Sequence, residues 1–339
     1  TQEKAQKLAA EIEKQIFKVE RLEKKEKKRY PVPPFITSTL QQEASRHYGF
    51  SSSRTMNIAQ GLYEGIDMGD EGPEGLITYM RTDSVRVEMS AIKEARNYIK
   101  GEYGNNFLPP EPIFYASKKS AQDAHEAIRP TNVYRTPKEV QSYLTPDQFK
   151  LYQLIWKRFV SSQMLPAIYD TVSLDIGAGR FMFRATGSIQ KFAGFLALYQ
   201  EKEDEENLDD EEKKLPNVEE GDLLDLLKLL QEQSFTKPPP RYTEASLVKE
   251  LEKSGIGRPS TYASIMNKIQ SREYTSKEQG RLKPTELGFL ISDLLDLNFN
   301  EIMKIDFTSN MEDDLEEVAE NKKEWREVVK HFWSHFFPT

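Results

Sequence analysis

Two proline clusters divide this chain into segments whose hydrophobic patterns differ. Pro31, Pro33 and Pro34 form the first cluster, and Pro238–Pro240 form the second. Proline fixes φ and has no backbone N–H, so each cluster interrupts regular structure and indicates a linker or a domain edge. Before the first cluster, residues 2–14 have helical periodicity, and residues 17–28 alternate like a strand with a lysine-rich outer face. The chain is therefore expected to contain several domains.

A similar order of capping signals follows each proline cluster. In the first block, residues 37–39 cap a helix that Gly49 ends, and residues 51–53 cap a second helix. In the second block, Thr243 caps a helix that Gly255 ends. A further helix follows, and then a two-stranded wing that turns at Gln279-Gly280. The parallel predicts two winged-helix units.

The remaining periodic segments predict helices before residue 165 and strands after it. Helical patterns occur near residues 88–101 and twice within 137–165. Three strand-like runs follow, at residues 171–179, 180–187 and 192–199. Residues 223–233 are apolar enough for a buried strand or a short helix, and periodicity does not decide between them.

Charge and composition narrow the classes of function. Residues 201–225 contain 13 acidic and 3 basic residues, so the rest of the chain has a net charge of +2, against −8 for the whole. This acidic run predicts a solvated loop and leaves room for basic grooves elsewhere. The absence of cysteine excludes disulfides and cysteine-ligated zinc in this chain. No apolar run approaches the roughly 20 residues that span a bilayer, so no membrane partner is expected.

The segment GLITYMRTDS, residues 75–84, places a phenol near a guanidinium and a carboxylate. If the segment is extended, Tyr79, Arg81 and Asp83 lie on one side of it. Two interpretations follow. Tyr79 is either a nucleophile with a cationic helper or a core tyrosine beside a surface ion pair.

Residues 255–261, GIGRPST, gather groups that suit a phosphate oxygen. Two glycines permit close approach of the backbone, Ser260 and Thr261 stand at the start of a helix, and Arg258 adds a guanidinium. An ordinary loop with a helix cap is the alternative. The nearby cations Lys249, Lys253 and Arg272 favour a nucleic-acid backbone.

Residues 122–131, QDAHEAIRPT, combine a histidine with an arginine. Helical spacing would place His125 and Arg129 on one face, where both could contact one anionic group. A structural histidine is the alternative.

Together these segments resemble the signature motifs of the type IA DNA topoisomerases, the family of bacterial DNA topoisomerase I. The resemblance rests on ITYMRTDS (77–84), DAHEAIRPT (123–131) and RYTEASLVKELEKSGIGRPSTYASI (241–265). Three further segments match in the family's order: 34–44, 151–164 and 306–319. The match covers nearly the whole chain.

The resemblance implies a multi-domain fold, mainly α, with a smaller antiparallel β arch and winged-helix units of the CAP type. It assigns residues 1–38 to the incomplete start of the arch and 166–235 to its second part. Residues 39–165 would form a helical gate domain that carries the catalytic tyrosine. Residues 236–339 would form part of a helical base domain with a winged-helix DNA-binding unit.

The resemblance also assigns roles to residues. Tyr79 stands at the position of the nucleophile that forms a 5′-phosphotyrosine, and Arg81 at that of the arginine on the scissile phosphate. Asp83 and His125 complete the expected catalytic set, and Thr261 joins their hydrogen-bonded network. The expected DNA contacts are Arg81, Arg129, Lys249, Arg258, Ser260, Thr261 and Arg272. One departure is Glu273, where the family commonly has glycine.

The implied activity is transient cleavage of one DNA strand, strand passage, and religation without ATP, which relaxes negatively supercoiled DNA. The family's Toprim domain, which binds Mg2+, has no counterpart in this sequence. We therefore expect a fragment that binds no metal itself, binds single-stranded DNA weakly and relaxes nothing alone. The full-length protein would be a cytoplasmic, nucleoid-associated monomer. The alternative is a non-catalytic single-strand-binding module on the same scaffold.

Overall fold

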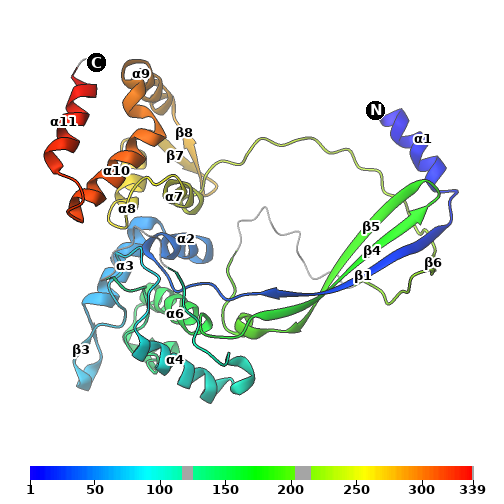
Figure 1. The fold of residues 1–339 in the computed structure, drawn as a ribbon, viewed down its shortest axis with the longest axis horizontal. Coiled ribbons are helices and arrows are strands. Elements are labelled where there is room, and N and C mark those ends of the chain that lie inside the picture. Colours follow the sequence, from blue (N-terminus) through cyan, green and yellow to red (C-terminus); the bar gives the residue numbers. More distant parts are fainter. Residues whose placement is uncertain (117–124, 203–214, 338–339) are drawn as a thin grey trace. The chain divides into compact units, whose positions relative to one another are not determined.

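The computed structural model describes residues 1–116, 125–202 and 215–337. These residues form two compact units, and the chain passes between them at the two proline clusters and again after Gln163 (Figure 1). Thr1–Pro31 and Met164–Pro239 form one, which we call the sheet unit. Val32–Gln163 and Pro240–Thr339 form the other, which we call the helical unit. In the part of the chain that the structure describes, no helix is long and apolar enough to cross a membrane.

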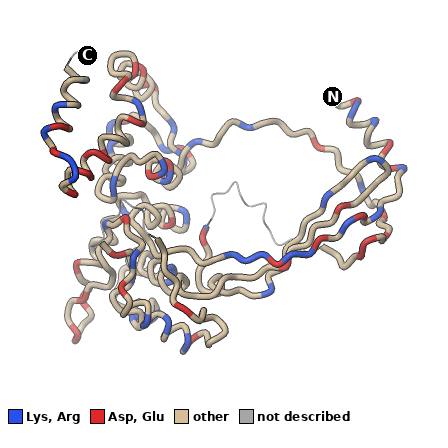
Figure 2. Tube along the Cα trace, in the orientation of Figure 1, with Lys and Arg blue, Asp and Glu red and all other residues tan. Residues whose placement is uncertain are grey.

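The sheet unit is an antiparallel sheet with the strand order β5-β4-β1-β6. Its elements are α1 (Gln2–Ile12), β1 (Phe17–Arg29), β4 (Ala167–Ala178), β5 (Phe181–Phe192) and β6 (Leu223–Leu224). β1 pairs with β4 along nearly its whole length, from Phe17 opposite Ala178 to Arg29 opposite Ala167. The predicted lysine-rich strand is confirmed, and its basic residues line β1 in Figure 2.

Two strand predictions in this unit need correction. The run 192–199 is not a strand, because Gly194–Ala197 form a 3-10 turn and Gly194 has a φ of +51°. A Cβ at Gly194 would lie 2.4 Å from the Pro166 carbonyl oxygen, so this close reversal ends β5. Within 223–233 only Leu223–Leu224 pair as a strand, and Leu227 is 96% exposed. Residues 203–214 of the acidic run 201–225 lie outside the described residues.

The first part of the helical unit confirms the predicted helices. Its elements are α2 (Thr37–Tyr48), α3 (Ser52–Glu64), β2 (Ile66–Asp67), η1 (Gly69–Glu71), β3 (Pro73–Glu74), α4 (Met89–Glu102), η2 (Asn105–Phe107), α5 (Pro137–Val140), η3 (Gln141–Tyr143) and α6 (Pro146–Ser161). α6 is the central helix, because its apolar residues are buried against α3, α4 and α5. Thr145 caps it by accepting from the Gln148 N–H.

Arg158 of α6 ties the two ends of this first part together. Its Nε donates to the Pro33 carbonyl oxygen at 2.6 Å, and its guanidinium carbon lies 4.8 Å from the centre of the Phe35 ring. The side chain is buried. The start of the first part, at residues 33–35, is therefore held beside the end of α6.

The second part of the helical unit begins after the second proline cluster. Its elements are α7 (Glu244–Lys253), α8 (Tyr262–Ser271), β7 (Thr275–Glu278), β8 (Arg281–Pro284), α9 (Glu286–Met303), α10 (Ile305–Ala319) and α11 (Trp325–Phe336). Val248, Tyr262, Met266 and Leu282 form a buried core between α7, α8 and β8. The predicted hairpin turn is confirmed, since Gln279 and Gly280 both have positive φ, at 48° and 80°.

Candidate active site

The segment that carries Tyr79 alternates between buried and exposed side chains. Met80 is 1% exposed, whereas Tyr79 is 44% exposed and Arg81 is also exposed. Thr82 is buried and Asp83 is half-buried. Tyr79, Arg81 and Asp83 therefore share the outer side of the segment, as the sequence predicts, and the interpretation of Tyr79 as a core tyrosine is wrong.

Thr37 at the start of α2 holds this segment in place. Its hydroxyl donates to the Met80 carbonyl oxygen at 2.7 Å and accepts from the Thr82 N–H at 2.9 Å. Its own N–H donates to the Thr82 carbonyl oxygen at 2.9 Å. Residues 37–39 were expected to cap α2, and Thr39 does so, because its hydroxyl accepts from the Ile36 N–H at 3.0 Å. Ile36 is the cap residue itself, and Thr37 is already helical. The hydroxyl of Thr37 serves the Tyr79 segment instead.

Tyr63 at the end of α3 is a neighbour of Tyr79 that the sequence analysis missed. It is 41% exposed, and its ring centre lies 5.3 Å from that of Tyr79, edge to face. Gly75 permits this approach, because a Cβ there would lie 2.7 Å from the Tyr63 carbonyl oxygen. Spacing in the sequence gives no signal for this contact, since it depends on how residue 75 crosses the end of α3.

The histidine motif is extended, so the predicted helical arrangement is wrong. Residues 125–129 contain no helix, and Ile128 bridges to Phe35 while Pro130 bridges to Ile77. The strand-like pairing with two distant segments replaces the local helical turn. Because of this, His125 and Arg129 do not share a helix face. The motif's first residues, including Asp123, lie outside the described residues.

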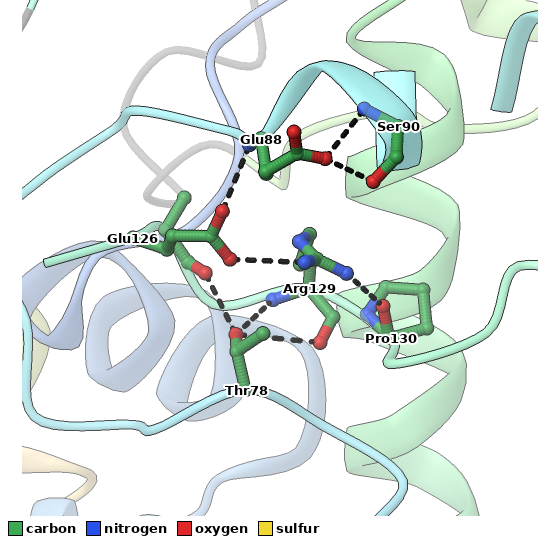
Figure 3. A network of polar contacts seen from close by, with 7 residues as sticks. Thr78, Glu88, Ser90, Glu126, Arg129 and Pro130 are labelled. Atoms are coloured by element: carbon green, nitrogen blue, oxygen red, sulfur yellow. Dashed lines mark hydrogen bonds and ion pairs between the residues drawn. The ribbon is translucent and has the colours of Figure 1, made fainter. Parts of the chain in front are cut away.

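The histidine motif nevertheless lies directly against the Tyr79 segment (Figure 3). The Thr78 hydroxyl donates to the Ala127 carbonyl oxygen at 2.7 Å and accepts from the Arg129 N–H at 3.0 Å. The Thr78 N–H donates to the Arg129 carbonyl oxygen at 2.9 Å. Thr78 immediately precedes Tyr79, so these bonds fix the backbone on one side of the phenol while Thr37 fixes it on the other.

The side chain of Arg129, which was expected to contact DNA, is engaged inside the protein. Its Nη2 donates to Glu126 at 2.9 Å, and its Nη1 donates to the Pro130 carbonyl oxygen at 3.0 Å (Figure 3). Glu126 also accepts from the Glu88 N–H at 2.8 Å, and Glu88 in turn caps α4 at Ser90. Arg129 is only 13% exposed, which places it as a brace for the segment beside Tyr79.

Arg258 in the glycine-rich motif faces α10. Its guanidinium lies 3.7 Å from Glu312, 3.6 Å from Asp313 and 3.3 Å from Glu316. It also donates to the Gly257 carbonyl oxygen at 3.0 Å. Burial raises the pKa of Glu316, Arg258 opposes this shift, and the charge on Asp83 adds to it.

The remaining predicted DNA contacts lie on α7, on the loop before α8 and at the end of α8. α8 begins at Tyr262, and the Thr261 hydroxyl accepts from the Arg258 N–H at 2.8 Å, so it closes the loop. Ser260, Lys249 and Arg272 are exposed. Among the described residues, no hydrogen bond joins His125 to Asp83 or Thr261, and the proposed network of these three stays a prediction.

The Tyr79 segment and the glycine-rich motif meet at a pocket. Thr82 and Asp83 line it together with Arg258, Pro259 and Tyr262. Burial raises the pKa of Tyr262, and the nearby charges of Glu252 and Asp83 raise it further. The three motifs thus converge in one unit, where the phenol is exposed between braced backbone segments.

A comparison with protein families decides the family. The model of the DNA topoisomerase family matches residues 1–330. The chain belongs to the DNA topoisomerase family. The membership predicted from the sequence is thus confirmed.

Known DNA topoisomerases share the sequence and the fold. DNA topoisomerase 1 of Xylella fastidiosa strain Temecula1 is 51% identical over 316 residues, which is 92% of this chain and 39% of the relative, and the protein of a second strain gives the same values. The structure of full-length topoisomerase I from Thermotoga maritima matches with a TM-score of 0.86 and 40% identity, covering 98% of this chain and 54% of that one. The chain therefore spans well under two thirds of these topoisomerases.

The one departure from the topoisomerase motif has a backbone explanation. Glu273 follows the end of α8 with a φ of +56°, a left-handed conformation in which glycine is unstrained. The glycine that the family commonly has at this position suits this turn. Glu273 is exposed, so its carboxylate points away from the core.

Magnesium, which the topoisomerase family implies, does not fit the side chains described here. Among residues 1–116, 125–202 and 215–337, no group of three or more His, Asp or Glu side chains could hold a metal ion. The carboxylates of Glu312 and Glu316 on α10 face Arg258 instead. No step is therefore assigned to a metal held by these residues.

Proposed function

We propose that this chain is the nucleophile-bearing part of a type IA DNA topoisomerase, with single-stranded DNA as its substrate. The observation that carries the proposal is the exposure of Tyr79 on a braced backbone. Its neighbour Met80 is buried, and Thr37 and Thr78 bond the backbone around it. A phenol that served only packing would have no need of this presentation.

In the proposed reaction the Tyr79 oxygen attacks a backbone phosphorus. The phenol gives up its proton as a bond forms between the phenolic oxygen and phosphorus, the bond from phosphorus to the 3′ oxygen breaks, and the 3′ oxygen takes up a proton. An ordinary phenol has a pKa of about 10, so the attack needs cationic stabilisation near neutral pH. Arg81, two residues away on the same exposed side, supplies a planar fork for two phosphate oxygens.

The linkage formed in this way conserves the energy of the broken phosphodiester. Attack of the 3′ hydroxyl on the phosphotyrosine restores the DNA backbone and frees the phenol, so religation needs no ATP. Strand passage through the open break would then relax negatively supercoiled DNA. Residues outside this chain, in a Toprim domain, would supply the Mg2+ site.

We extend the proposal to the domain roles. Residues 39–165 would form the gate domain, 1–38 and 166–235 the β arch, and 236–339 part of the base. α7, α8 and the β7–β8 hairpin have the order of elements that a winged-helix unit requires. Exposed Lys249, Ser260 and Arg272 on this unit would contact phosphates of the single strand.

The test uses a chimera in which this chain replaces the matching region of a full-length Xylella fastidiosa DNA topoisomerase 1. Single-stranded DNA labelled at its 3′ end is incubated with Mg2+ and quenched in denaturant. Because the phosphate stays on tyrosine, the label is expected to migrate with the protein. Tyr79→Phe removes the adduct entirely, whereas Tyr143→Phe, at another exposed tyrosine, retains it.

Two outcomes would contradict the proposal. Label that binds in native gels but never becomes covalent with either form would favour a non-catalytic binding module. Relaxation of negatively supercoiled plasmid by the 339-residue chain alone, purified free of host enzyme, would show that no other part is needed.

A further inference from the structure

The ring of Tyr79 is held less firmly than its backbone. The hydroxyls of Thr37 and Thr78 bond the backbone around it, but no hydrogen bond holds the Tyr79 hydroxyl in the part of the chain that the structure describes. The side chain is 44% exposed, so packing covers only part of it. Exposed side chains change rotamer within nanoseconds. A fixed backbone therefore does not by itself fix the position of the phenolic oxygen.

Tyr63 is the aromatic neighbour of this ring. The two ring centres lie 5.3 Å apart with an interplanar angle of 64°, which is the edge-to-face arrangement that aromatic pairs prefer. Tyr63 is itself 41% exposed, so the pair stands at the surface and not in the core. Such a pair stabilises one arrangement of the two rings beyond the effect of the area that they bury. The contact thus favours one rotamer of Tyr79 over the others.

The end of α3 holds Tyr63 at a set distance from the Tyr79 segment. The Leu76 N–H donates to the Leu62 carbonyl oxygen at 2.8 Å, and both of these side chains are fully buried. Gly75 lets the segment cross the end of α3 closely, because a Cβ there would lie 2.7 Å from the Tyr63 carbonyl oxygen. The ring of Tyr63 is therefore presented from a helix end that is bonded directly to the segment it contacts.

A ring contact restrains a nucleophile without engaging its reactive atom. A hydrogen bond to the phenolic oxygen would compete with phosphorus for its lone pairs, and full burial of the side chain would exclude the DNA strand. A neighbouring ring limits the side-chain torsions and leaves the oxygen free. Holding a reacting atom close to its attack geometry lowers the barrier, because less orientational freedom is lost on the way to the transition state.

We propose that Tyr63 is a positioning residue for the reaction of Tyr79. Its ring selects the rotamer of Tyr79 and so sets the direction in which the phenolic oxygen points. The ring carries this role, and the Tyr63 hydroxyl takes no part in it. This inference rests on the proposed function and adds a determinant of the cleavage rate to it.

The test measures the rate of adduct formation in the chimera with Xylella fastidiosa DNA topoisomerase 1, in a single turnover with the protein in excess. The affinity of each variant for the same single-stranded DNA is measured by fluorescence anisotropy. Tyr63→Phe keeps the ring and should react at the wild-type rate. Tyr63→Leu keeps apolar bulk without the ring, and it should slow adduct formation about threefold to tenfold, the effect of one aromatic pair. Its DNA affinity should change less than about twofold, because Tyr63 acts through Tyr79 and not on the strand.

A second variant disturbs the pair without changing either ring. Gly75→Ala places a methyl group against the Tyr63 carbonyl oxygen, so the segment must shift from α3, and adduct formation should slow at least about threefold. Gly101→Ala on α4 is the control, because no described residue lies within 4 Å of a Cβ there. Tyr134→Leu is the control for the ring, since Tyr134 is 49% exposed and pairs edge to face with Tyr98 at 6.2 Å. Both controls should react at the wild-type rate.

Replacement of Tyr79 by 3-fluorotyrosine gives a readout that does not depend on the reaction. The 19F resonance of this residue in the 339-residue chain senses the ring current of the neighbouring aromatic ring. Tyr63→Leu should therefore move the resonance towards that of free fluorotyrosine, whereas Tyr63→Phe should leave it in place.

The outcomes separate this inference from the proposed function. A wild-type rate in Tyr63→Leu, or an equal loss of rate in Tyr63→Phe, would overturn the positioning role and leave the proposed function intact. A loss of DNA affinity that accounts for the whole loss of rate would make Tyr63 a DNA contact, and it would overturn the positioning role as well. Absence of any Tyr79 adduct in the chimera with Tyr63 in place would overturn both.

Discussion

Arg81 and Arg258 stand on two loops of the same unit, and their surroundings differ. Arg81 is exposed, and no carboxylate pairs with it in the part of the chain that the structure describes. Arg258 is three-quarters buried, with carboxylates of Glu312, Asp313 and Glu316 within 3.7 Å. The backbone near Arg81 is held by the hydroxyls of Thr37 and Thr78, whereas the side chain of Arg258 is held by carboxylates.

This difference indicates two ways of preparing a guanidinium for phosphate. A phosphate at Arg81 meets a free charge on a backbone already held in place. A phosphate at Arg258 must displace carboxylates that already compensate the charge, so the net gain there is small. We therefore expect Arg81 to contribute more to binding than Arg258 in this conformation.

The largest expected effect comes from removing the hydroxyl that braces the Tyr79 segment. Thr37→Val keeps the shape of the side chain but leaves the buried Thr82 N–H without its side-chain acceptor. We expect the free energy of unfolding of the helical unit to fall by about 2 kcal/mol, as measured by urea denaturation. Adduct formation in the chimera should fall more than about tenfold, because the phenol is no longer held in one position.

Thr186→Val on β5 is the control for this variant, since Thr186 is exposed in the sheet unit. It should leave both measurements unchanged. If Thr37→Val lowered stability but left adduct formation at the wild-type level, the Thr37 hydroxyl would stabilise the fold without positioning Tyr79. The difference between the Arg81 and Arg258 loops would then have no bearing on the reaction.

A second variant makes Arg258 resemble Arg81. Glu312→Gln combined with Glu316→Gln removes two carboxylates from the guanidinium at nearly constant volume. We expect single-stranded DNA to bind about five- to tenfold more tightly at low salt, with a steeper salt dependence. Glu317→Gln removes one charge from a more exposed position of α10, and its smaller effect measures long-range electrostatics alone.

The raised pKa of Glu316 predicts a pH dependence of the same contact. At pH values just above 4.5, the ordinary pKa of a glutamate, Glu316 remains partly protonated in the folded protein because its pKa is raised. Its contribution to stability is therefore complete below pH 4.5 and is lost as pH rises through the raised pKa. Protonation also releases Arg258, so DNA affinity should rise as pH falls towards 4.5. Glu316→Gln should flatten this rise, and an unchanged slope would show that Glu316 does not restrain Arg258.

The smallest expected effect concerns the turn after α8. Glu273→Gly places the residue without Cβ at a φ of +56°, and we expect the helical unit to gain about 1 kcal/mol of stability. Glu278→Gly, in the regular strand β7, should instead lose stability. Thermal melting of both variants gives the comparison, and a loss in Glu273→Gly would mean that the carboxylate makes a stabilising contact.

The elements that local pattern predicts well are those whose burial follows a single period. α6 is an example, since its apolar residues at helical spacing are buried. In β1 only Phe17 and Val19 alternate with exposed neighbours. Tyr79, Arg81 and Asp83 share a side for the same reason. The hairpin turn at Gln279-Gly280 was predictable because its residue types match its backbone geometry.

The features that failed depend on partners distant in the sequence. His125 to Arg129 have helical spacing, but pairing with residues 35 and 77 draws them into extended structure. Thr37 has the chemistry of a helix cap, yet its hydroxyl is used by a segment more than forty residues away. Periodicity also could not show that Gly194 reverses the chain, because that turn is set by the carbonyl groups of residues 165 and 166.

The hydrogen bond from Arg158 to the Pro33 carbonyl oxygen has a consequence for the folding of the sheet. β1 pairs with β4 although about 140 residues separate them in sequence, and closing such a loop carries a large entropic cost and slows folding. If residues 33–163 fold first, Arg158 brings their two ends together and shortens the effective loop to a few residues. Arg158→Met would then slow refolding of the sheet more than it slows refolding of the helices, which makes one internal hydrogen bond a determinant of folding order.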